Sequence, residues 1–88
     1  MRQITVDCRG FTPRTGMHKV LADALSFPDR HGRNLDALHD MLTDIRQDTL
    51  LDLTNLDRSA PENRGLLLVL ADAQRENPHL KVFFDGEP

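Results

Sequence analysis

The sequence predicts an α/β fold in two layers, a three-stranded parallel sheet with helices packed on one face. Three segments have strand character and helix-like segments separate them, which calls for parallel strands joined by right-handed crossovers. The first and last strand segments alternate outward and inward residues, so we expect helices to cover only one face of the sheet. With 88 residues, the chain is expected to form a single domain, residues 1–88, without an internal repeat or linker.

The first half of the chain is expected to contain one strand and two helices. Apolar and polar residues alternate over residues 4–8, the period-2 pattern of a half-buried strand. Thr15 is positioned to cap a helix that runs to residue 25, and Gly16 weakens only its first turn. Residues 26–33 have no period and contain Pro and Gly, which predicts a loop. Asn34 then caps a second helix, whose apolar stripe consists of Leu35, Leu38, Leu42 and Ile45.

The second half adds a strand, a helix and a strand. Residues 49–54 are rich in Leu and Thr and supply the middle strand. Ser59 and Glu62 match an S-x-x-E capping box, which places the start of the third helix there. That helix is expected to run to about residue 76, because the following Asn-Pro pair stops it. Residues 80–85 form the last strand, with Leu80, Val82 and Phe84 on one side.

Composition restricts the class of protein. Cys8 is the single cysteine, so an intrachain disulfide and a CxxC metal knuckle are both excluded, and we expect a buried structural thiol. The sequence contains no run of about 18 apolar residues that could span a bilayer, and no basic start followed by an apolar core. We therefore expect a cytoplasmic protein that does not bind a membrane.

Charge is distributed unevenly along the chain. Residues 1–35 carry six Lys and Arg against three Asp, whereas residues 36–62 carry seven acids against two Arg. Nucleic-acid binding requires a basic surface that displaces counterions from phosphates, and the middle segment offers the opposite. The sequence therefore predicts a cationic partner and no nucleic-acid binding, although acids that serve only solubility would give a similar composition.

Two pairs of acids share the same helical spacing. Asp36 and Asp40 on the second helix, like Asp72 and Glu76 on the third, are four residues apart, hence about 40° apart around the helix axis. If the two helices lie side by side on the sheet, four carboxylates can face one way, next to the loop that precedes the second helix. Ordinary solvated helix faces show the same spacing, so the pairs alone do not establish a site.

A longer motif covers the entry to the second helix. Residues 27–43 read FPDRHGRNLDALHDMLT. This segment resembles the barstar family of ribonuclease inhibitors, whose members carry Pro-x-x-x-Gly-x-Asn-Leu-Asp-Ala-Leu-x-Asp-x-Leu-Thr where the inhibitory helix begins. The resemblance covers most of the remaining chain in the order and length of its elements, and it implies a barstar-like fold.

The resemblance also implies a function. It implies an intracellular inhibitor, not an enzyme, that blocks the cationic active site of a microbial ribonuclease of the barnase or toxin type. Such an inhibitor uses carboxylates borne on helices, is monomeric when free, binds its nuclease one to one and needs no metal or cofactor. A protein of this kind can serve as an immunity protein.

The family pattern assigns roles to particular positions. By resemblance, Asp40 is the main phosphate-mimicking carboxylate, Asp36 lies one turn earlier, and Asp72 flanks them. The backbone of the loop before the helix would line the rim of the contact, where Asp44 adds a charge. The implied partner-binding residues are Arg30, His31, Gly32, Asn34, Asp36, His39, Asp40, Asp44, Asp72 and Glu76.

The chain departs from the family pattern in its aromatic residues. Positions where relatives often carry aromatic side chains read Arg30, His31, His39 and Ile45 here, and the chain has no Trp or Tyr. Because aromatic residues often dominate interface energy, a barstar scaffold that binds a non-nuclease partner stays open as an alternative.

A metal-dependent nuclease built on the four paired carboxylates is a further alternative, and binding of Mg²⁺ or Mn²⁺ would distinguish it from an inhibitor. His39 is expected to be a contact residue whose titration makes binding depend on pH.

Overall fold

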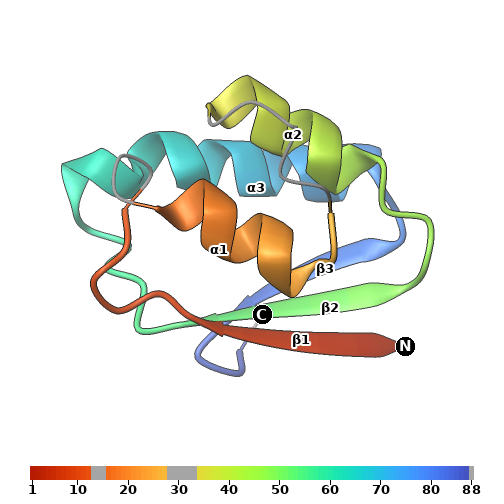
Figure 1. Ribbon diagram of the computed structural model, residues 1–88, viewed down its shortest axis with the longest axis horizontal. Helices are drawn as coiled ribbons and strands as arrows, with labels where there is room; N and C mark the ends of the chain where they lie inside the picture. Colours follow the sequence, from red (N-terminus) through yellow and green to blue (C-terminus); the bar gives the residue numbers. More distant parts are fainter. Residues whose placement is uncertain (13–15, 28–33, 88) are drawn as a thin grey trace.

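The computed structural model describes residues 1–12, 16–27 and 34–87, and Figure 1 shows the arrangement of its elements. Three strands alternate with helices along the chain, as the sequence predicts. The elements are β1 (Arg2–Asp7), α1 (Met17–Ala24), α2 (Leu35–Thr43), β2 (Thr49–Thr54), a 3₁₀ turn η1 (Pro61–Asn63), α3 (Arg64–Glu76) and β3 (Leu80–Phe84).

The three strands form one parallel sheet in the order β1-β2-β3. The register places Ile4 beside Leu51 and Leu51 beside Val82, so these residues point to the same side of the sheet. All three helices lie on that side in Figure 1. The predicted fold class, a three-stranded parallel sheet with helices on one face, is therefore confirmed.

The helices lie at different depths above the sheet. Of the three strands, α1 packs on β1 and α3 on β3, whereas α2 packs chiefly against α3. In Figure 1, α2 accordingly lies furthest from the strands. Gly65 permits this approach, because a β-carbon at that position would lie 2.7 Å from Cδ1 of Leu35. As a result α2 is held by its inner face while its outer face points away from the domain.

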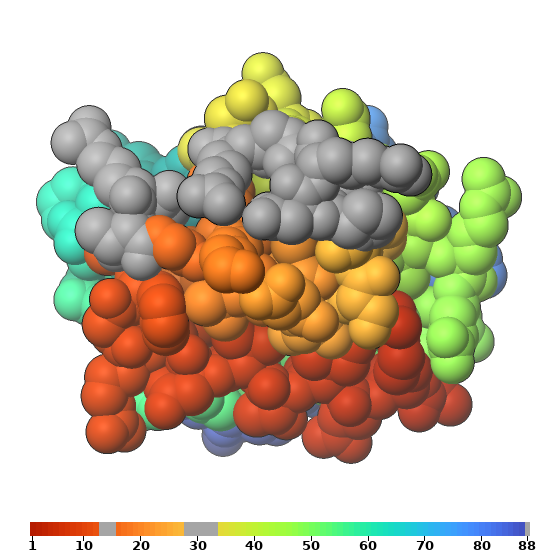
Figure 2. All heavy atoms as spheres, in the orientation of Figure 1, coloured from red at the N-terminus to blue at the C-terminus, as the bar shows by residue number. Residues whose placement is uncertain are grey.

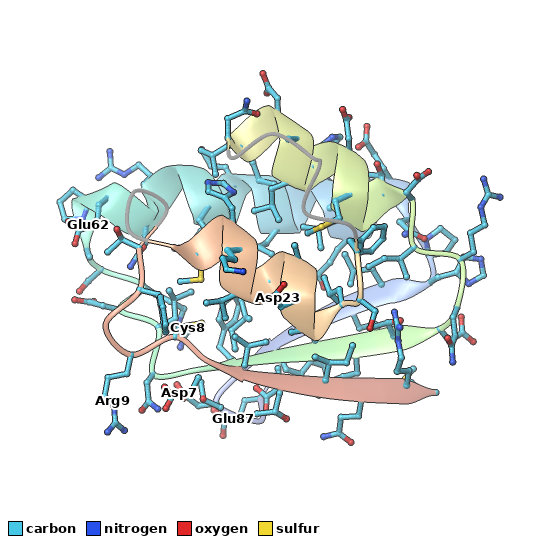
Figure 3. All side chains as sticks on the ribbon, viewed as in Figure 1. Asp7, Cys8, Arg9, Asp23, Glu62 and Glu87 are labelled. Atoms are coloured by element: carbon cyan, nitrogen blue, oxygen red, sulfur yellow. The ribbon has the colours of Figure 1, made fainter. Side chains whose placement is uncertain are left out.

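The core fills the space between the sheet and the helices. Leu51 and Leu53 of the central strand are fully buried against Leu21, Leu66 and other helix residues. Cys8 follows β1 on the helix side and is 2% exposed, whereas its neighbours Asp7 and Arg9 are exposed (Figure 3). The prediction of a buried structural thiol is therefore confirmed.

The starts of α1 and α3 bear on the two helix caps that the sequence led us to expect there. The first helix begins at Met17, after Gly16 in a left-handed conformation with φ 99°, and Thr15, the expected cap, lies outside the described residues. The predicted capping box of the third helix is wrong. The hydroxyl and the backbone N–H of Ser59 both donate to Oδ1 of Asp57, and a 3₁₀ turn precedes the α-helix, which begins at Arg64.

Candidate functional site

Local sequence determines where α2 begins and which of its faces is buried. Oδ1 of Asn34 accepts a hydrogen bond of 2.8 Å from the backbone N–H of Ala37, which is the predicted cap. Leu38, Met41 and Leu42 are buried, so the inner face of the helix is apolar. The opposite face is therefore free to carry charge.

The three aspartates of this region occupy that outer face. Asp36, Asp40 and Asp44 are all exposed, and the side chain of Asp40 is 82% exposed. They follow one another at intervals of four residues, so each lies about 40° around the axis from the last. Figure 2 shows α2, in yellow and green, along the upper edge of the molecule. We call Asp36, Asp40 and Asp44 the α2 carboxylates.

A contact between the helices brings the acids of α3 to the same surface. Nε2 of His39 on α2 lies 2.5 Å from Oε2 of Glu76 on α3, and its Nδ1 lies 4.0 Å from Oδ1 of Asp40. Asp72 lies one turn before Glu76, and these two side chains are 50% and 58% exposed. The structure therefore brings Asp40 and both acids of α3 to one side of the domain, around His39.

The two groups of carboxylates differ in their counter-ions. The guanidinium of Arg75 contacts Oδ1 of Asp72, and the imidazole of His39 contacts Glu76. Within the described part of the chain, no Lys or Arg lies within 4.0 Å of an α2 carboxylate. Unlike Asp72, the α2 carboxylates therefore have no Lys or Arg counter-ion among the described residues.

Two of the three α2 carboxylates lie where the helix dipole disfavours a negative charge. Asp36 lies in the first turn, where the positive end of the helix dipole favours a negative charge. Asp40 and Asp44 lie at the other end, which carries no basic residue in its last turn. A carboxylate there is disfavoured by the partial negative charge of the free carbonyls. Asp40 and Asp44 therefore lower the stability of the free helix.

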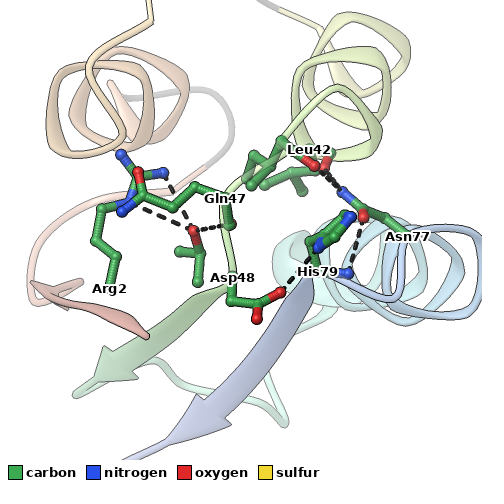
Figure 4. A network of polar contacts seen from close by, with 8 residues as sticks. Arg2, Leu42, Gln47, Asp48, Asn77 and His79 are labelled. Carbon is green, nitrogen blue, oxygen red and sulfur yellow. Dashed lines mark hydrogen bonds and ion pairs between the residues drawn. The ribbon is translucent and has the colours of Figure 1, made fainter.

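Asn77 fixes the far end of α2, a role that sequence reasoning missed. Its Nδ2 donates hydrogen bonds of 2.9 Å to the backbone carbonyls of Leu42 and Ile45, as the close-up in Figure 4 shows for Leu42. Its Oδ1 accepts from the backbone N–H of His79. The Asn-Pro pair indicated only the end of a helix, and no spacing in the sequence links Asn77 to carbonyls more than 30 residues earlier.

Some of the expected site residues lie outside the described residues. These are Arg30, His31 and Gly32 of the loop before α2. Asn34, also expected at the contact, is described, and its side chain oxygen serves as the cap of α2.

The described residues contain no group of three or more His, Cys, Asp or Glu side chains that could hold a metal ion. Burial raises the pKa of the Cys8 thiol to about 11, which keeps it protonated and unreactive near neutral pH. None of the helices in the described ranges has the length and apolar character needed to cross a bilayer.

Comparison with known proteins identifies the family. The model of the barstar family, described as "Barstar (barnase inhibitor)", matches residues 1–85. The chain belongs to the barstar family. Within that family's fold, the α2 carboxylates lie on the helix that carries the family motif.

A curated relative matches part of this barstar-family chain. It is the Bacillus subtilis (strain 168) protein named "Putative ribonuclease inhibitor YrdF", which is 54% identical over 43 residues. The match covers 49% of this chain and 47% of the relative, so the two align over about half of the length of each.

Proposed function

We propose that this barstar-family protein is an inhibitor, not an enzyme, that blocks the cationic active site of a microbial ribonuclease with the α2 carboxylates. The observation that carries the proposal is the row of exposed aspartates on a helix whose two ends are both fixed, by Asn34 and by Asn77. The family match over residues 1–85 and the name of the Bacillus relative support it.

The chemistry of a ribonuclease active site suits this surface. Such a site holds Arg, Lys and His side chains in place to bind a phosphodiester, and carboxylates on a rigid helix can occupy the same positions. Opposite charges speed the encounter of the two proteins, an effect for which the barnase–barstar pair itself is a documented case. RNA is then excluded because its phosphates and the carboxylates compete for the same cations.

The proposed contact includes the residues that the family pattern implies. Asp40 lies at its centre, with Asp36 and Asp44 on the same helix and with Asp72, Glu76 and His39 at the α3 side. Arg30, His31, Gly32 and Asn34 would line the rim. We propose a one-to-one complex formed by a free monomer in the cytoplasm, a reducing compartment compatible with the single thiol.

Inhibition of RNA cleavage by barnase tests this proposal. The purified protein is titrated into barnase with a fluorogenic RNA substrate, and the wild type is compared with Asp40→Ala. We expect the wild type to inhibit at a near-stoichiometric ratio and Asp40→Ala to inhibit at least tenfold more weakly, because a buried charge pair at the interface is lost.

Asp23→Ala is the matched control, since Asp23 is also an exposed aspartate on a helix but lies on α1. It should inhibit like the wild type, and both variants should unfold at the same urea concentration as the wild type to within a small margin. Equal inhibition by Asp40→Ala and the wild type would move the contact away from α2.

A second function has one observation in its favour. The chain contains no Trp or Tyr, and aromatic residues are the common anchors of tight interfaces. A member of the family that has lost them could bind a partner other than a nuclease through the same acidic surface. In the titration above, absence of inhibition by the wild type across barnase-type and toxin ribonucleases would favour this second function.

A further inference from the structure

We infer that Arg75 is a specificity-determining residue of this surface: it neutralises Asp72 within the chain and competes with the partner for that carboxylate. The inference rests on the proposed function and adds to it a second, weaker half of the contact. A nuclease that engages only the α2 carboxylates binds without disturbing Arg75, whereas one that reaches α3 has to displace it.

The geometry of α3 supports this role. Arg75 follows Asp72 by three residues, a spacing that places both side chains on neighbouring positions of one helix face. Its guanidinium contacts Oδ1 of Asp72, and its side chain is 78% exposed. Arg75 is thus positioned at the solvent edge of the surface, where an approaching cationic protein meets it.

Asp72 differs from the other acids of the surface in its counter-ion. Glu76 has the imidazole of His39 as its partner, which is a full cation only when protonated. Asp72 has a guanidinium, which stays charged at every accessible pH. Within the ranges that the structure describes, the α2 carboxylates have no such partner. Asp72 is therefore the acid whose attraction for a nuclease is most reduced by the chain itself.

The strength of the pair makes displacement possible. Exposed ion pairs contribute little to stability, because both side chains give up hydration and conformational freedom to form them. A partner cation can therefore replace Arg75 at Asp72. Because the bond between Asp72 and Arg75 is lost, the partner gains less binding free energy at Asp72. The displaced guanidinium also places a positive charge beside a cationic partner. Both effects select against nucleases that depend on Asp72.

A double-mutant cycle on the inhibitor tests the inference. The binding of wild type, Asp72→Asn, Arg75→Gln and the double variant to catalytically inactive barnase is measured by surface plasmon resonance at low and high salt. Lys81→Gln is the matched control, because Lys81 is an exposed cation on β3 that points to the uncovered face of the sheet. It removes the same charge at a distance from α3.

We expect Arg75→Gln to tighten binding roughly two- to fivefold at low salt, the range set by the energy of an exposed ion pair. Lys81→Gln should change affinity less. Asp72→Asn should weaken binding more in the Arg75→Gln background than in the wild type, because the free carboxylate then contributes fully. This non-additivity is the signature of competition, and a general charge effect would not produce it.

Other results would overturn the inference. Unchanged or weaker binding of Arg75→Gln, or an equal cost of Asp72→Asn in both backgrounds, would show that Arg75 does not compete for Asp72. That outcome leaves the proposed function intact as long as the wild type binds barnase at least tenfold more tightly than Asp40→Ala does. If the wild type binds neither barnase nor any other barnase-type or toxin ribonuclease, the proposed function fails and the inference fails with it.

Discussion

Asn77 illustrates how a single buried side chain positions a surface that it does not touch. The last carbonyls of a helix have no partner within the helix. At the end of α2 the side chain of Asn77 reaches the carbonyl of Leu42 and, just beyond the helix, the carbonyl of Ile45. The amide of Asn77 satisfies both, at 2.9 Å each, and ties α2 to the end of α3. The acids of α2 and α3 are thereby held in a constant relation.

Replacement of Asn77 should therefore destabilise the protein. Asn77→Ala removes the side-chain donor of the buried Ile45 carbonyl and leaves the Leu42 carbonyl with only a long backbone hydrogen bond of 3.4 Å from the N–H of Ile45. We expect the free energy of unfolding to fall by about 1–3 kcal/mol. Urea denaturation followed by circular dichroism measures the change. Asn77→Asp keeps the acceptor for the N–H of His79 but loses the donor, so it should be at least as harmful; a near-neutral Asn77→Asp would refute the role of the amide.

Because of Cys8, we expect the stability of the protein to decrease at alkaline pH. Burial raises its pKa from 9.0 to about 11, so the unfolded chain ionises its thiol at a lower pH than the folded protein does. This contribution to stability is fully present below pH 9 and is lost as the pH rises from 9 to 11. Urea unfolding across this range should show a decline that is absent in Cys8→Ala. Parallel pH profiles for the two proteins would contradict the assignment.

At the scale of elements, α2 carries charges that favour binding over its own stability. Asp36 lies in the first turn, where the helix dipole stabilises a negative charge, but Asp40 and Asp44 lie at the C-terminal end, where the dipole destabilises one. The proposed function would explain this placement, because a cationic nuclease would offset the repulsion in the complex. The free helix is left slightly destabilised.

Neutral variants at the two ends of α2 should therefore shift stability in opposite directions. Asp44→Asn removes a charge from the unfavourable end and should raise the free energy of unfolding by roughly 0.3–1 kcal/mol at low salt. Asp36→Asn removes a favourable charge and should lower it by a similar amount. Urea midpoints at low and high salt measure both, and the differences should shrink in high salt. Shifts of the same sign would show that the dipole does not determine them.

The starts of α2 and α3 show why a capping rule predicts one helix start correctly and another wrongly. Asn34 forms the predicted cap, because its Oδ1 accepts a hydrogen bond from the backbone N–H of Ala37. Ser59 has a competing partner, because Asp57 two residues earlier accepts both its hydroxyl and its N–H, and these bonds also lower the pKa of Asp57. The local turn therefore occupies the backbone N–H of Ser59, which Glu62 would have to accept in a capping box, and directs the hydroxyl to Asp57 instead. The S-x-x-E pattern contains no information about this competitor.

At the scale of the whole molecule, periodicity was sufficient to predict the sheet and its covered face. It predicted the outward direction of Asp36 and Asp40, since these residues alternate with the buried stripe of α2. It could not predict the contacts of His39 with Glu76 or of Asn77 with α2. Those depend on how closely two helices approach, which is determined by Gly65 and by side-chain packing rather than by any repeat in the sequence.

The layers of the fold place α2 on the outside of the molecule. The sheet holds α1 and α3, and α3 in turn holds α2, so the helix that carries the α2 carboxylates is the one furthest from the strands (Figure 1). Such a surface can enter the active site of another protein without rearrangement of the core. The central claim of the account is that these carboxylates take the place of RNA phosphates.

Competition for the nuclease measures this claim most directly. A fluorescent, non-cleavable RNA oligonucleotide is bound to barnase and displaced with increasing amounts of the inhibitor, while anisotropy reports the bound fraction. We expect complete displacement, with a midpoint that rises in proportion to the oligonucleotide concentration, because one site cannot hold both. A complex in which RNA and inhibitor are bound to the nuclease together would contradict the account.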